Sequence, residues 1–191
     1  MRLCFASNNA HKLVEIQALL GNDFELLTLS DIGCTEELEE TGDTLEANSL
    51  QKADYLYQNY RINCFADDTG LEIEVLDGEP GVISARYAGL QRNAQDNMAL
   101  VLKKLAGKSD WSAQFRTVIT LILEGNVHQF EGIVKGEIIP EQRGTGGFGY
   151  DPIFVPEGLT KTFGEMSLTQ KSTLSHRARA FQQLEEFLKY M

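Results

Sequence analysis

The chain is poor in the residues that mark several classes of protein. Its 191 residues include only three cysteines, four prolines and one tryptophan. The cysteines, Cys4, Cys34 and Cys64, are odd in number and widely spaced, so they match neither a zinc-binding pattern nor a disulfide framework. Unpaired cysteines are typical of a reducing compartment, and we therefore expect a cytoplasmic protein.

Long hydrophobic runs are also absent. No apolar segment approaches the roughly 20 residues that a helix needs to cross a bilayer. The largely apolar run at residues 2–6 is followed at once by polar residues, so it is too short for a signal peptide. The sequence has no internal repeat, low-complexity segment or linker, and we expect a single domain over residues 1–191 with no membrane partner.

Positive charge is scarce as well. Lysine and arginine number 17 against 28 aspartates and glutamates, which gives a formal net charge of −11. Such a balance disfavours binding to nucleic-acid polymers and to anionic membranes. A small phosphorylated ligand stays compatible with it, provided that a few lysines or a divalent cation offset the charge locally.

Hydrophobic periodicity predicts helices and strands that intermix along the chain, which is typical of an α/β fold with a mixed sheet. Asn9 and its polar neighbours can cap a helix that ends at Gly21, and Gly125-Asn126 predicts a hairpin turn. Further helices are expected at residues 44–58, 98–107 and 178–188. Strands are expected at residues 2–6, 24–27, 62–66, 71–76, 113–123 and 127–139.

The glycine-rich run at residues 144–152, Gly-Thr-Gly-Gly-Phe-Gly-Tyr-Asp-Pro, is the most informative segment. Its glycines let the backbone come close to a ligand. Phe148 or Tyr150 could stack on a flat ring, and Asp151 could accept hydrogen bonds from ring N–H groups. The run also fits G-x-G-x-x-G, but a dinucleotide loop needs a strand before it and a helix after it, whereas Pro152 follows here. We therefore favour a nucleobase pocket.

A polar segment at residues 7–12, Ser-Asn-Asn-Ala-His-Lys, lies where a strand leads into a helix. Backbone N–H groups at a helix N-terminus attract anions, and Lys12 adds a cation one turn further on. The segment lacks the glycine spacing of a Walker A loop. It predicts a phosphate-binding site of another kind.

Paired carboxylates, Asp67 and Asp68, follow an apolar strand. Adjacent carboxylates at such a place need a cation or donors, and Mg²⁺ prefers carboxylate oxygens together with phosphates and water. Glu39 and Glu40 could supply further ligands. Asp68 also begins Asp-Thr-Gly, the tripeptide of aspartic proteases, but those enzymes need two such aspartates and this chain has one Asp-Thr-Gly. We therefore set the protease interpretation aside.

Lys171 and the run Ser175-His176-Arg177 come at the start of the last predicted helix. The guanidinium of Arg177 is a fixed fork of donors that suits phosphate or ring oxygens. His176 can donate or accept a hydrogen bond.

Taken in order, these motifs resemble those of the inosine triphosphate pyrophosphatase (HAM1-like) family over nearly the whole chain. Pro80-Gly81 and the run Ser84–Gly89 add a further matching block. The resemblance implies Mg²⁺-dependent hydrolysis of ITP, dITP and XTP to the monophosphate and pyrophosphate. It also implies a homodimer and an elongated mixed α/β fold of two lobes, with the active site in the cleft between them.

The resemblance implies residue roles too. Asp68 is similar to the catalytic carboxylate, and Glu39 together with Asp68 is similar to the metal-binding pair, with Glu40 as the neighbouring candidate. Donors such as Arg177 and backbone N–H groups would favour the 6-keto oxygen of hypoxanthine over an amino group. The implied substrate-binding residues are Ser7, Asn8, Asn9, Ala10, His11, Lys12, Lys52, Thr69, Phe148, Gly149, Tyr150, Asp151, Lys171, His176 and Arg177.

Two positions depart from the family pattern. Asn8 stands where the family often has glycine, and residues 168–170 read Leu-Thr-Gln where it often has glutamates.

Two other functions fit the same motifs. One is a Maf-like pyrophosphatase that acts on modified pyrimidines or methylated nucleotides. The other is a nucleotide-binding sensor without turnover.

Overall fold

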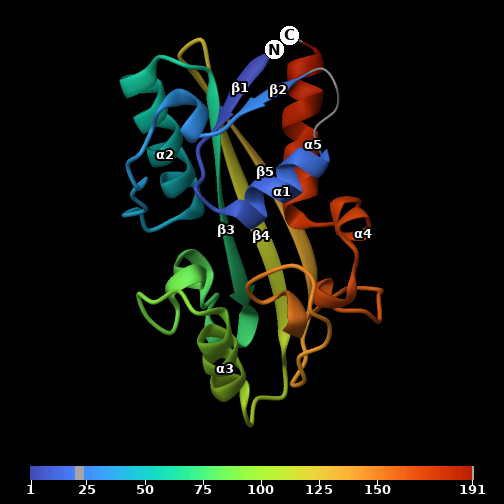
Figure 1. The fold of residues 1–191 in the computed structure, drawn as a ribbon. Coiled ribbons are helices and arrows are strands. Elements are labelled where there is room, and N and C mark those ends of the chain that lie inside the picture. Colours follow the sequence, from blue (N-terminus) through green and yellow to red (C-terminus); the bar gives the residue numbers. More distant parts are fainter. Residues whose placement is uncertain (20–23, 191) are drawn as a thin grey trace. The chain divides into compact units, whose positions relative to one another are not determined.

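The computed structural model describes residues 1–19 and 24–190. Six strands form one sheet in the order β2-β1-β3-β4-β5-β6 (Figure 1). β1 pairs in parallel with β2 and β3, whereas β5 pairs antiparallel with β6, so the predicted mixed sheet is confirmed. The strands are β1 (Arg2–Phe5), β2 (Glu25–Leu27), β3 (Cys64–Ile73), β4 (Ser112–Leu123), β5 (Asn126–Ile138) and β6 (Phe154–Pro156).

Five α-helices and several single 3₁₀ turns flank this sheet in the described part of the chain. All four helices expected from periodicity are confirmed, whereas the short helix α4 was not predicted. The expected end of the first helix at Gly21 lies outside the described residues. The helices are α1 (Ala10–Leu19), α2 (Leu45–Tyr60), α3 (Ala94–Leu105), α4 (Leu168–Ser172) and α5 (His176–Lys189). The 3₁₀ turns are η1 (Ser30–Ile32), η2 (Glu74–Leu76), η3 (Gly81–Arg86), η4 (Asp151–Ile153) and η5 (Phe163–Glu165).

Two strands differ from the expectation: β6 (Phe154–Pro156) was not predicted, and β3 was predicted as two strands. The sequence predicts two strands separated by the polar residues 67–70, but β3 runs unbroken from Cys64 to Ile73 and is followed by a 3₁₀ turn. The backbone of Gly81 approaches the strand at Gly70, where a Cβ atom would lie only 2.7 Å from the carbonyl oxygen of Gly81. Asp67 and Asp68 therefore lie within a strand rather than in a turn.

The hairpin between β4 and β5 is confirmed, with its turn one residue earlier than expected. Glu124 and Gly125 occupy the turn, with φ of +51° and +85°. Two successive positive φ angles are the signature of the tight turn that joins twisted antiparallel strands.

The chain divides into two compact units. Unit 1 comprises Met1–Asp68, Thr117–Gly132 and Arg177–Met191, and unit 2 comprises Thr69–Arg116 and Ile133–His176. The long strands β3, β4 and β5 contribute residues to both. The expected position of the active site between two lobes, and the single domain over residues 1–191, stay predictions.

Unit 1 has an aromatic and an aliphatic core cluster. Phe5 of β1 stacks on Phe65 of β3 with ring centroids 4.9 Å apart, and Phe181 of α5 packs on the same ring. A second cluster joins β1 and β3 to α2 and contains all three cysteines, which are free and buried. These clusters fix α2 and α5 to β3, the strand that carries Asp67 and Asp68.

Unit 2 has its own core. Phe115 of β4 packs edge-on against Phe154 of β6 at 4.7 Å, and Phe163 lies against both rings. Apolar residues of α3, among them Met98, join this cluster. The core therefore holds β6 and η5 in place beside the glycine-rich run.

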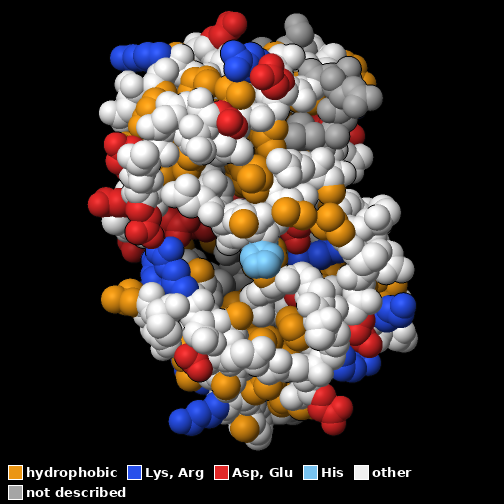
Figure 2. All heavy atoms as spheres, viewed as in Figure 1, with side chains coloured by type: hydrophobic (Ala, Val, Ile, Leu, Met, Phe, Trp, Pro, Cys, Tyr) orange, Lys and Arg blue, Asp and Glu red, His pale blue; other side chains and the backbone are white. Residues whose placement is uncertain are grey.

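Charged side chains of both signs are dispersed among hydrophobic ones on the face shown in Figure 2. The most exposed large hydrophobic residues include Leu90 and Tyr190. Within residues 1–19 and 24–190, no helix has the length and apolar character that crossing a membrane requires.

Candidate active site

The segment at residues 7–12 forms a self-capped helix start. Asn9 precedes α1, and its Oδ1 accepts hydrogen bonds from the backbone N–H groups of His11 at 3.0 Å and Lys12 at 3.2 Å. Ser7 Oγ accepts a hydrogen bond from Asn9 N at 3.2 Å. The predicted cap is therefore confirmed, while Asn8, Asn9, Ala10 and His11 themselves are exposed. The local bonds hold this short turn in shape at the surface of unit 1.

Two lysines of unit 1 converge on Asp67. Lys12 Nζ donates to Asp67 Oδ1 at 3.0 Å, and Lys52 Nζ donates to the Asp67 carbonyl oxygen at 2.7 Å. Burial lowers the pKa of Lys12, and the nearby Asp67 offsets this only in part. Burial acts on Lys52 in the same way, but Asp68, Glu40 and Asp67 together raise its pKa. One buried lysine and one partly buried lysine thus lie beside the strand residue that precedes Asp68.

Arg177 completes this cluster from α5. Its side chain is fully buried, and its Nε donates to Asp67 Oδ2 at 3.0 Å while Nη1 pairs with Glu15 of α1. Burial would raise the pKa of Asp67, but Lys12, Arg177 and Lys52 hold it far below its ordinary value. The guanidinium predicted to contact a purine is thus bound to two carboxylates of unit 1.

Asp68 differs from its neighbour. It is 5% exposed, and its Oδ2 accepts a hydrogen bond from Asn48 Nδ2 of α2 at 3.0 Å. Burial raises its pKa above the ordinary aspartate value, with Lys52 and Lys12 opposing the shift. A carboxylate with a raised pKa is a stronger base, which suits proton abstraction from water.

Asn48 is a residue that the sequence reasoning missed. Asn48 and Lys52 lie four residues apart on α2, so both side chains belong to one face of that helix, and both are buried. Two polar residues at this spacing on a helix that packs on a sheet were the signal that could have found it.

Glu39 and Glu40 occupy different environments. Glu40 Oε1 accepts a hydrogen bond from Lys52 Nζ at 2.5 Å, whereas Glu39 is exposed. Burial would raise the pKa of Glu40, but the charge of Lys52 lowers it below the ordinary glutamate value. Among the described residues, no group of three or more His, Cys, Asp or Glu side chains is arranged to hold a metal ion.

The donor set of unit 1 nevertheless fits a hard cation such as Mg²⁺. Mg²⁺ is usually bound by one or two carboxylates and takes its remaining ligands from water and substrate phosphates. The cluster brings four carboxyl groups and three basic side chains together. The carboxylates are Glu15, Glu40, Asp67 and Asp68, and the cations are Lys12, Lys52 and Arg177.

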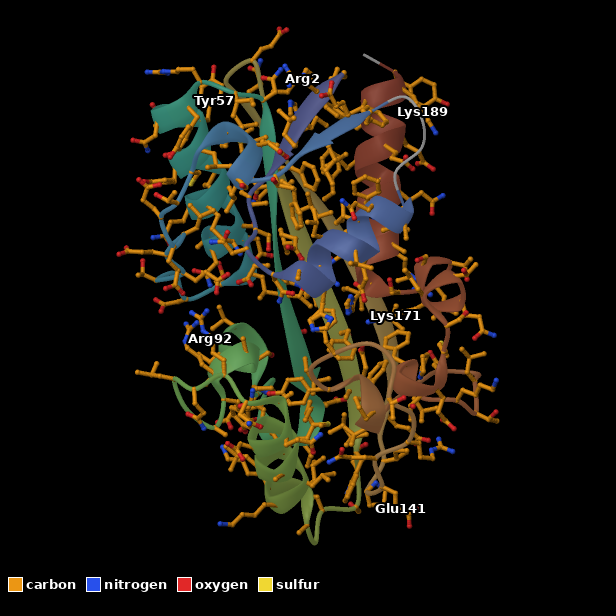
Figure 3. All side chains as sticks on the ribbon, in the orientation of Figure 1. Arg2, Tyr57, Arg92, Glu141, Lys171 and Lys189 are labelled. Carbon is orange, nitrogen blue, oxygen red and sulfur yellow. The ribbon has the colours of Figure 1, made fainter. Side chains whose placement is uncertain are left out.

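In unit 2, the glycine-rich run folds around Asp151. Its Oδ2 accepts hydrogen bonds from the backbone N–H of Phe148 at 2.7 Å and from Lys171 Nζ of α4 at 2.6 Å. Gly147 makes room for this carboxylate, because a Cβ atom there would lie 2.0 Å from Asp151 Oδ2. Figure 3 labels Lys171 beside the run that it supports. Asp151, itself 2% exposed, therefore ties the run to α4.

The two aromatic residues of the run have different surroundings. Tyr150 is buried, and its hydroxyl donates to the Ser84 carbonyl oxygen at 2.7 Å. Phe148 is only partly buried, and Lys171 Nζ lies 5.0 Å from its ring centroid. Of the two, Phe148 has the more accessible ring for stacking on a base.

Three other residues of unit 2 were predicted to bind the substrate: His176, Thr69 and Gly149. His176 is 2% exposed and packs edge-on against the Phe115 ring at 4.7 Å. Thr69 is partly buried next to Asp68 in β3, and Gly149 has a φ of +62°. Unit 2 thus brings Phe148, Asp151 and Lys171 together directly.

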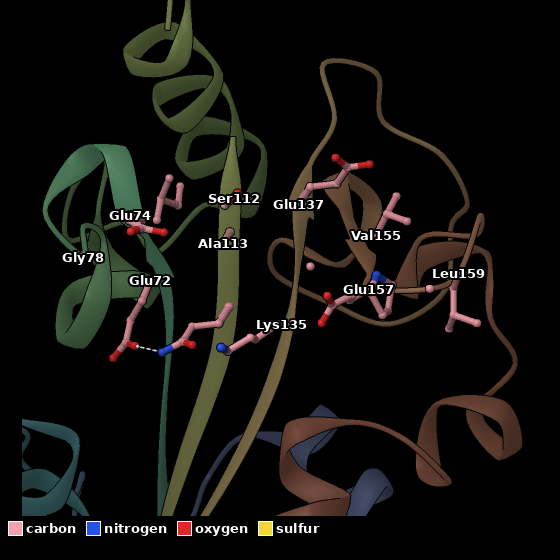
Figure 4. A pocket seen from close by; sticks show the side chains of 15 residues that line it. Glu72, Glu74, Gly78, Ser112, Ala113, Lys135, Glu137, Val155, Glu157 and Leu159 are labelled. Carbon is pink, nitrogen blue, oxygen red and sulfur yellow. Dashed lines mark hydrogen bonds between the residues drawn. The ribbon is translucent and has the colours of Figure 1, made fainter. Parts of the chain in front are cut away.

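A separate pocket of about 700 Å³ lies elsewhere in unit 2 (Figure 4). Residues of β3, β4, β5 and β6 line it, together with the segments that follow β3 and β6. Gln114 Nε2 donates to Glu72 Oε2 at 2.7 Å on its wall, which is the dashed line drawn at Glu72. It contains none of the predicted site residues.

A mixed sheet whose central strand carries paired aspartates beside two lysines places the chain in a class of α/β proteins equipped for phosphate chemistry. A sequence model described as the Ham1 family matches residues 3–187. The chain belongs to this family.

Similar proteins agree with that assignment. A protein from Flavobacterium johnsoniae named dITP/XTP pyrophosphatase is 55% identical over 98% of both chains, and one of the same name from Porphyromonas gingivalis is 50% identical over 98% of this chain and 97% of its own. The solved structure of the Staphylococcus aureus Ham1 protein covers 99% of this chain and 98% of its own, with a TM-score of 0.90 at 37% identity. The Coxiella burnetii HAM1 protein covers 100% of both, with a TM-score of 0.92 at 35% identity.

Proposed function

We propose that this protein hydrolyses the non-canonical purine nucleoside triphosphates dITP, ITP and XTP to the monophosphate and pyrophosphate, and so removes deaminated purines from the nucleotide pool. The observation that carries the proposal is the cluster of Lys12, Lys52, Asp67 and Asp68 in unit 1. Relatives of full length and up to 55% identity that are named dITP/XTP pyrophosphatase support this substrate class.

Asp68 acts as the base in this proposal. It accepts a proton from a water molecule, and the oxygen of that water attacks the α-phosphorus. The bond between the α-phosphorus and the oxygen that bridges the α- and β-phosphates breaks, and pyrophosphate leaves. Lys12 and Lys52 neutralise the charge that develops on the departing pyrophosphate. Bound Mg²⁺, held by Asp68 and by Glu39 or Glu40, would offset phosphate charge and polarise the attacked group.

The segment at residues 7–12 binds phosphate oxygens in this proposal. The turn from Ser7 to His11, exposed from Asn8 onward, supplies polar groups at a helix N-terminus, where the helix dipole favours an anion. Lys12 and Lys52 carry the positive charge that the turn itself lacks.

The purine is assigned to unit 2. Phe148 stacks on the purine ring. The carboxylate of Asp151 accepts a hydrogen bond from the backbone N–H of Phe148 and so holds Phe148 in place. Lys171, 5.0 Å from the Phe148 ring centroid, and backbone N–H groups of the run donate to the 6-keto oxygen of hypoxanthine or xanthine. Adenine carries a 6-amino group there, which would leave these donors without an acceptor, so ATP is discriminated against.

The enzyme acts as a cytoplasmic homodimer in this proposal. Three buried, free cysteines suit a reducing compartment. The dimer rests on the family resemblance of the sequence motifs.

The experiment that tests the proposal is pyrophosphate release from ITP, XTP, dGTP and dATP, with Mg²⁺ and with excess EDTA. We expect fast release from ITP or XTP, little from dGTP or dATP, and none in EDTA. Turnover of modified pyrimidine or methylated nucleotides alone would replace the substrate class with that of the Maf-like enzymes. Tight binding of ITP without any pyrophosphate release would identify a sensor and overturn the enzymatic proposal.

A further inference from the structure

We propose that Asn48 of α2 is a positioning residue, which orients the carboxylate of Asp68 and fixes the acidic loop that carries Glu39 and Glu40. The proposal rests on the proposed function, because it assigns Asn48 a part in that reaction. Asn48 does not itself need to contact the substrate.

Both polar atoms of the Asn48 side chain are used, each on a different segment of unit 1. Nδ2 donates to Asp68 Oδ2 at 3.0 Å, and Oδ1 accepts from the backbone N–H of Gly42 at 2.8 Å. The side chain is 0% exposed. One planar amide therefore joins β3 to the loop that precedes α2.

The loop is held closely at that point. A Cβ atom on Gly42 would lie 2.7 Å from Ala47 Cβ and 3.0 Å from Asn48 Oδ1, so the contact requires glycine. The preceding residue is also bound, since Thr41 N donates to Gln51 Oε1 at 3.1 Å. The backbone next to Glu40 is thus tied to α2 at two successive positions.

The start of α2 is fixed as well. Thr44 Oγ1 accepts a hydrogen bond from Ala47 N at 3.1 Å and so caps the helix. Asn48 and Lys52, one turn apart, then reach Asp68 and Glu40 from a helix whose N-terminus cannot easily fray. α2 thereby fixes the position of the acidic loop relative to Asp68 on β3.

The contact matters for catalysis because it fixes the direction in which a lone pair of the Asp68 carboxylate points. The terminal torsion of an aspartate is broad, so a carboxylate without a fixed partner samples many orientations. A hydrogen bond that holds Oδ2 sets where Oδ1 points. Rate depends steeply on such orientation, because a reacting group must already face its partner when the water attacks.

Asn48→Asp separates the two contacts. The new carboxylate has nearly the same shape and keeps an acceptor for Gly42 N–H, but it replaces the amide donor that faces Asp68 with an oxygen. We expect kcat for ITP to fall about 10- to 100-fold, with KM changed less than about threefold. Hydrogen exchange of the peptide spanning residues 39–43 should stay as in the wild type.

Asn48→Leu removes both contacts. We expect kcat to fall at least as far as in Asn48→Asp, and exchange of residues 39–43 in the free protein to become faster. The exchange measurement needs no substrate, so it reports on the loop whether or not the enzyme turns over.

Asn97 of α3 offers a matched control. It is also buried in a helix, and it also joins two backbone groups, with Oδ1 accepting from Ala88 N at 2.7 Å and Nδ2 donating to Ala85 O at 3.0 Å. Both of these partners are backbone groups of unit 2 rather than carboxylates. We expect Asn97→Asp to lower Tm about as much as Asn48→Asp while kcat stays within about threefold of the wild type.

An Asn48→Asp enzyme with wild-type kcat would overturn the role of Asn48. Equal losses of kcat in Asn48→Asp and Asn97→Asp would also overturn it, because they would show a loss of stability alone. A wild-type protein that releases no pyrophosphate from any triphosphate would instead overturn the proposed function. The two failures are therefore distinguishable.

Discussion

Adjacent residues of one strand carry opposite electrostatic states. The pKa of Asp67 is held low by three cations, whereas burial raises that of Asp68. The charged form of Asp67 therefore stabilises the folded state through its ion pairs, whereas burial disfavours the charged form of Asp68. This difference predicts opposite consequences of the same substitution at the two positions.

At Asp67, replacement with asparagine leaves Arg177 and Lys12 without their central partner. Breaking a buried ion pair typically costs about 3–5 kcal/mol, so we expect the free energy of unfolding at pH 7 to fall by about that much. Urea unfolding measures it. An unchanged unfolding midpoint would contradict the structural role that we assign to Asp67.

The pH dependence of this contribution has a definite sign. The folded-state pKa of Asp67 lies below its unfolded value of about 3.9, so its stabilisation is present above that pH and is lost as pH falls through the lower folded value. Asp67→Asn should therefore flatten the acid side of the stability curve relative to the wild type. If the free energy of unfolding of Asp67→Asn fell as steeply with decreasing pH as that of the wild type, the assigned role of Asp67 would be contradicted.

At Asp68, replacement with asparagine removes the base. We expect kcat for ITP to fall by about 100- to 10,000-fold, the range ascribed to general acid–base catalysis. Because the folded-state pKa of Asp68 is raised, folding at neutral pH disfavours its charge, and the variant should unfold at an equal or higher temperature. Calorimetry and pyrophosphate release together check this, and an active variant would refute the assignment.

At the scale of single elements, the sequence predicted the helices and most strands because their apolar spacing is local. It predicted the cap of α1 from Asn9, and Lys52 came from the family resemblance. It could not predict that β3 would continue through Asp67 and Asp68, since that depends on hydrogen-bonding partners in other strands. Nor could it predict the pairing of Arg177 with Glu15, which lie 162 residues apart.

The glycine-rich run gives a prediction at this scale. In Gly147→Ala, the new Cβ would displace the Asp151 carboxylate, which holds both Phe148 and Lys171. We expect KM for ITP to rise at least about tenfold, since a purine contact worth about 1.4 kcal/mol changes affinity by that factor. Gly158→Ala is the control, because Gly158 also has positive φ, +77°, yet its added Cβ would meet nothing within 4 Å.

Phe148 itself can be tested within the same element. Phe148→Ala removes the ring that we assign to base stacking but leaves the backbone N–H that Asp151 accepts. KM for ITP should rise more than kcat falls, because stacking contributes mainly to binding. An unchanged KM in steady-state kinetics would refute stacking by Phe148.

At the scale of the whole molecule, the family assignment covers residues 3–187 and the relatives match over nearly their full lengths. The sequence alone was enough to predict the family, because five motifs in one order are far more specific than any single motif. The oligomeric state belongs to this scale. Sedimentation equilibrium should give about twice the mass of one chain at micromolar concentration, and a mass of one chain would refute the homodimer.

The alternation of side chains along β3 has an evolutionary consequence. Successive strand residues point to opposite faces, and here Asp67 contacts α1 and α5 while Asp68 contacts α2. Adding or deleting one residue between Cys64 and Asp67 would exchange the two faces, so that the paired aspartate and the proposed base would trade environments. A change in the length of this stretch would therefore disturb the site as much as replacing either aspartate, whereas a substitution that keeps the length would leave each aspartate on its own face.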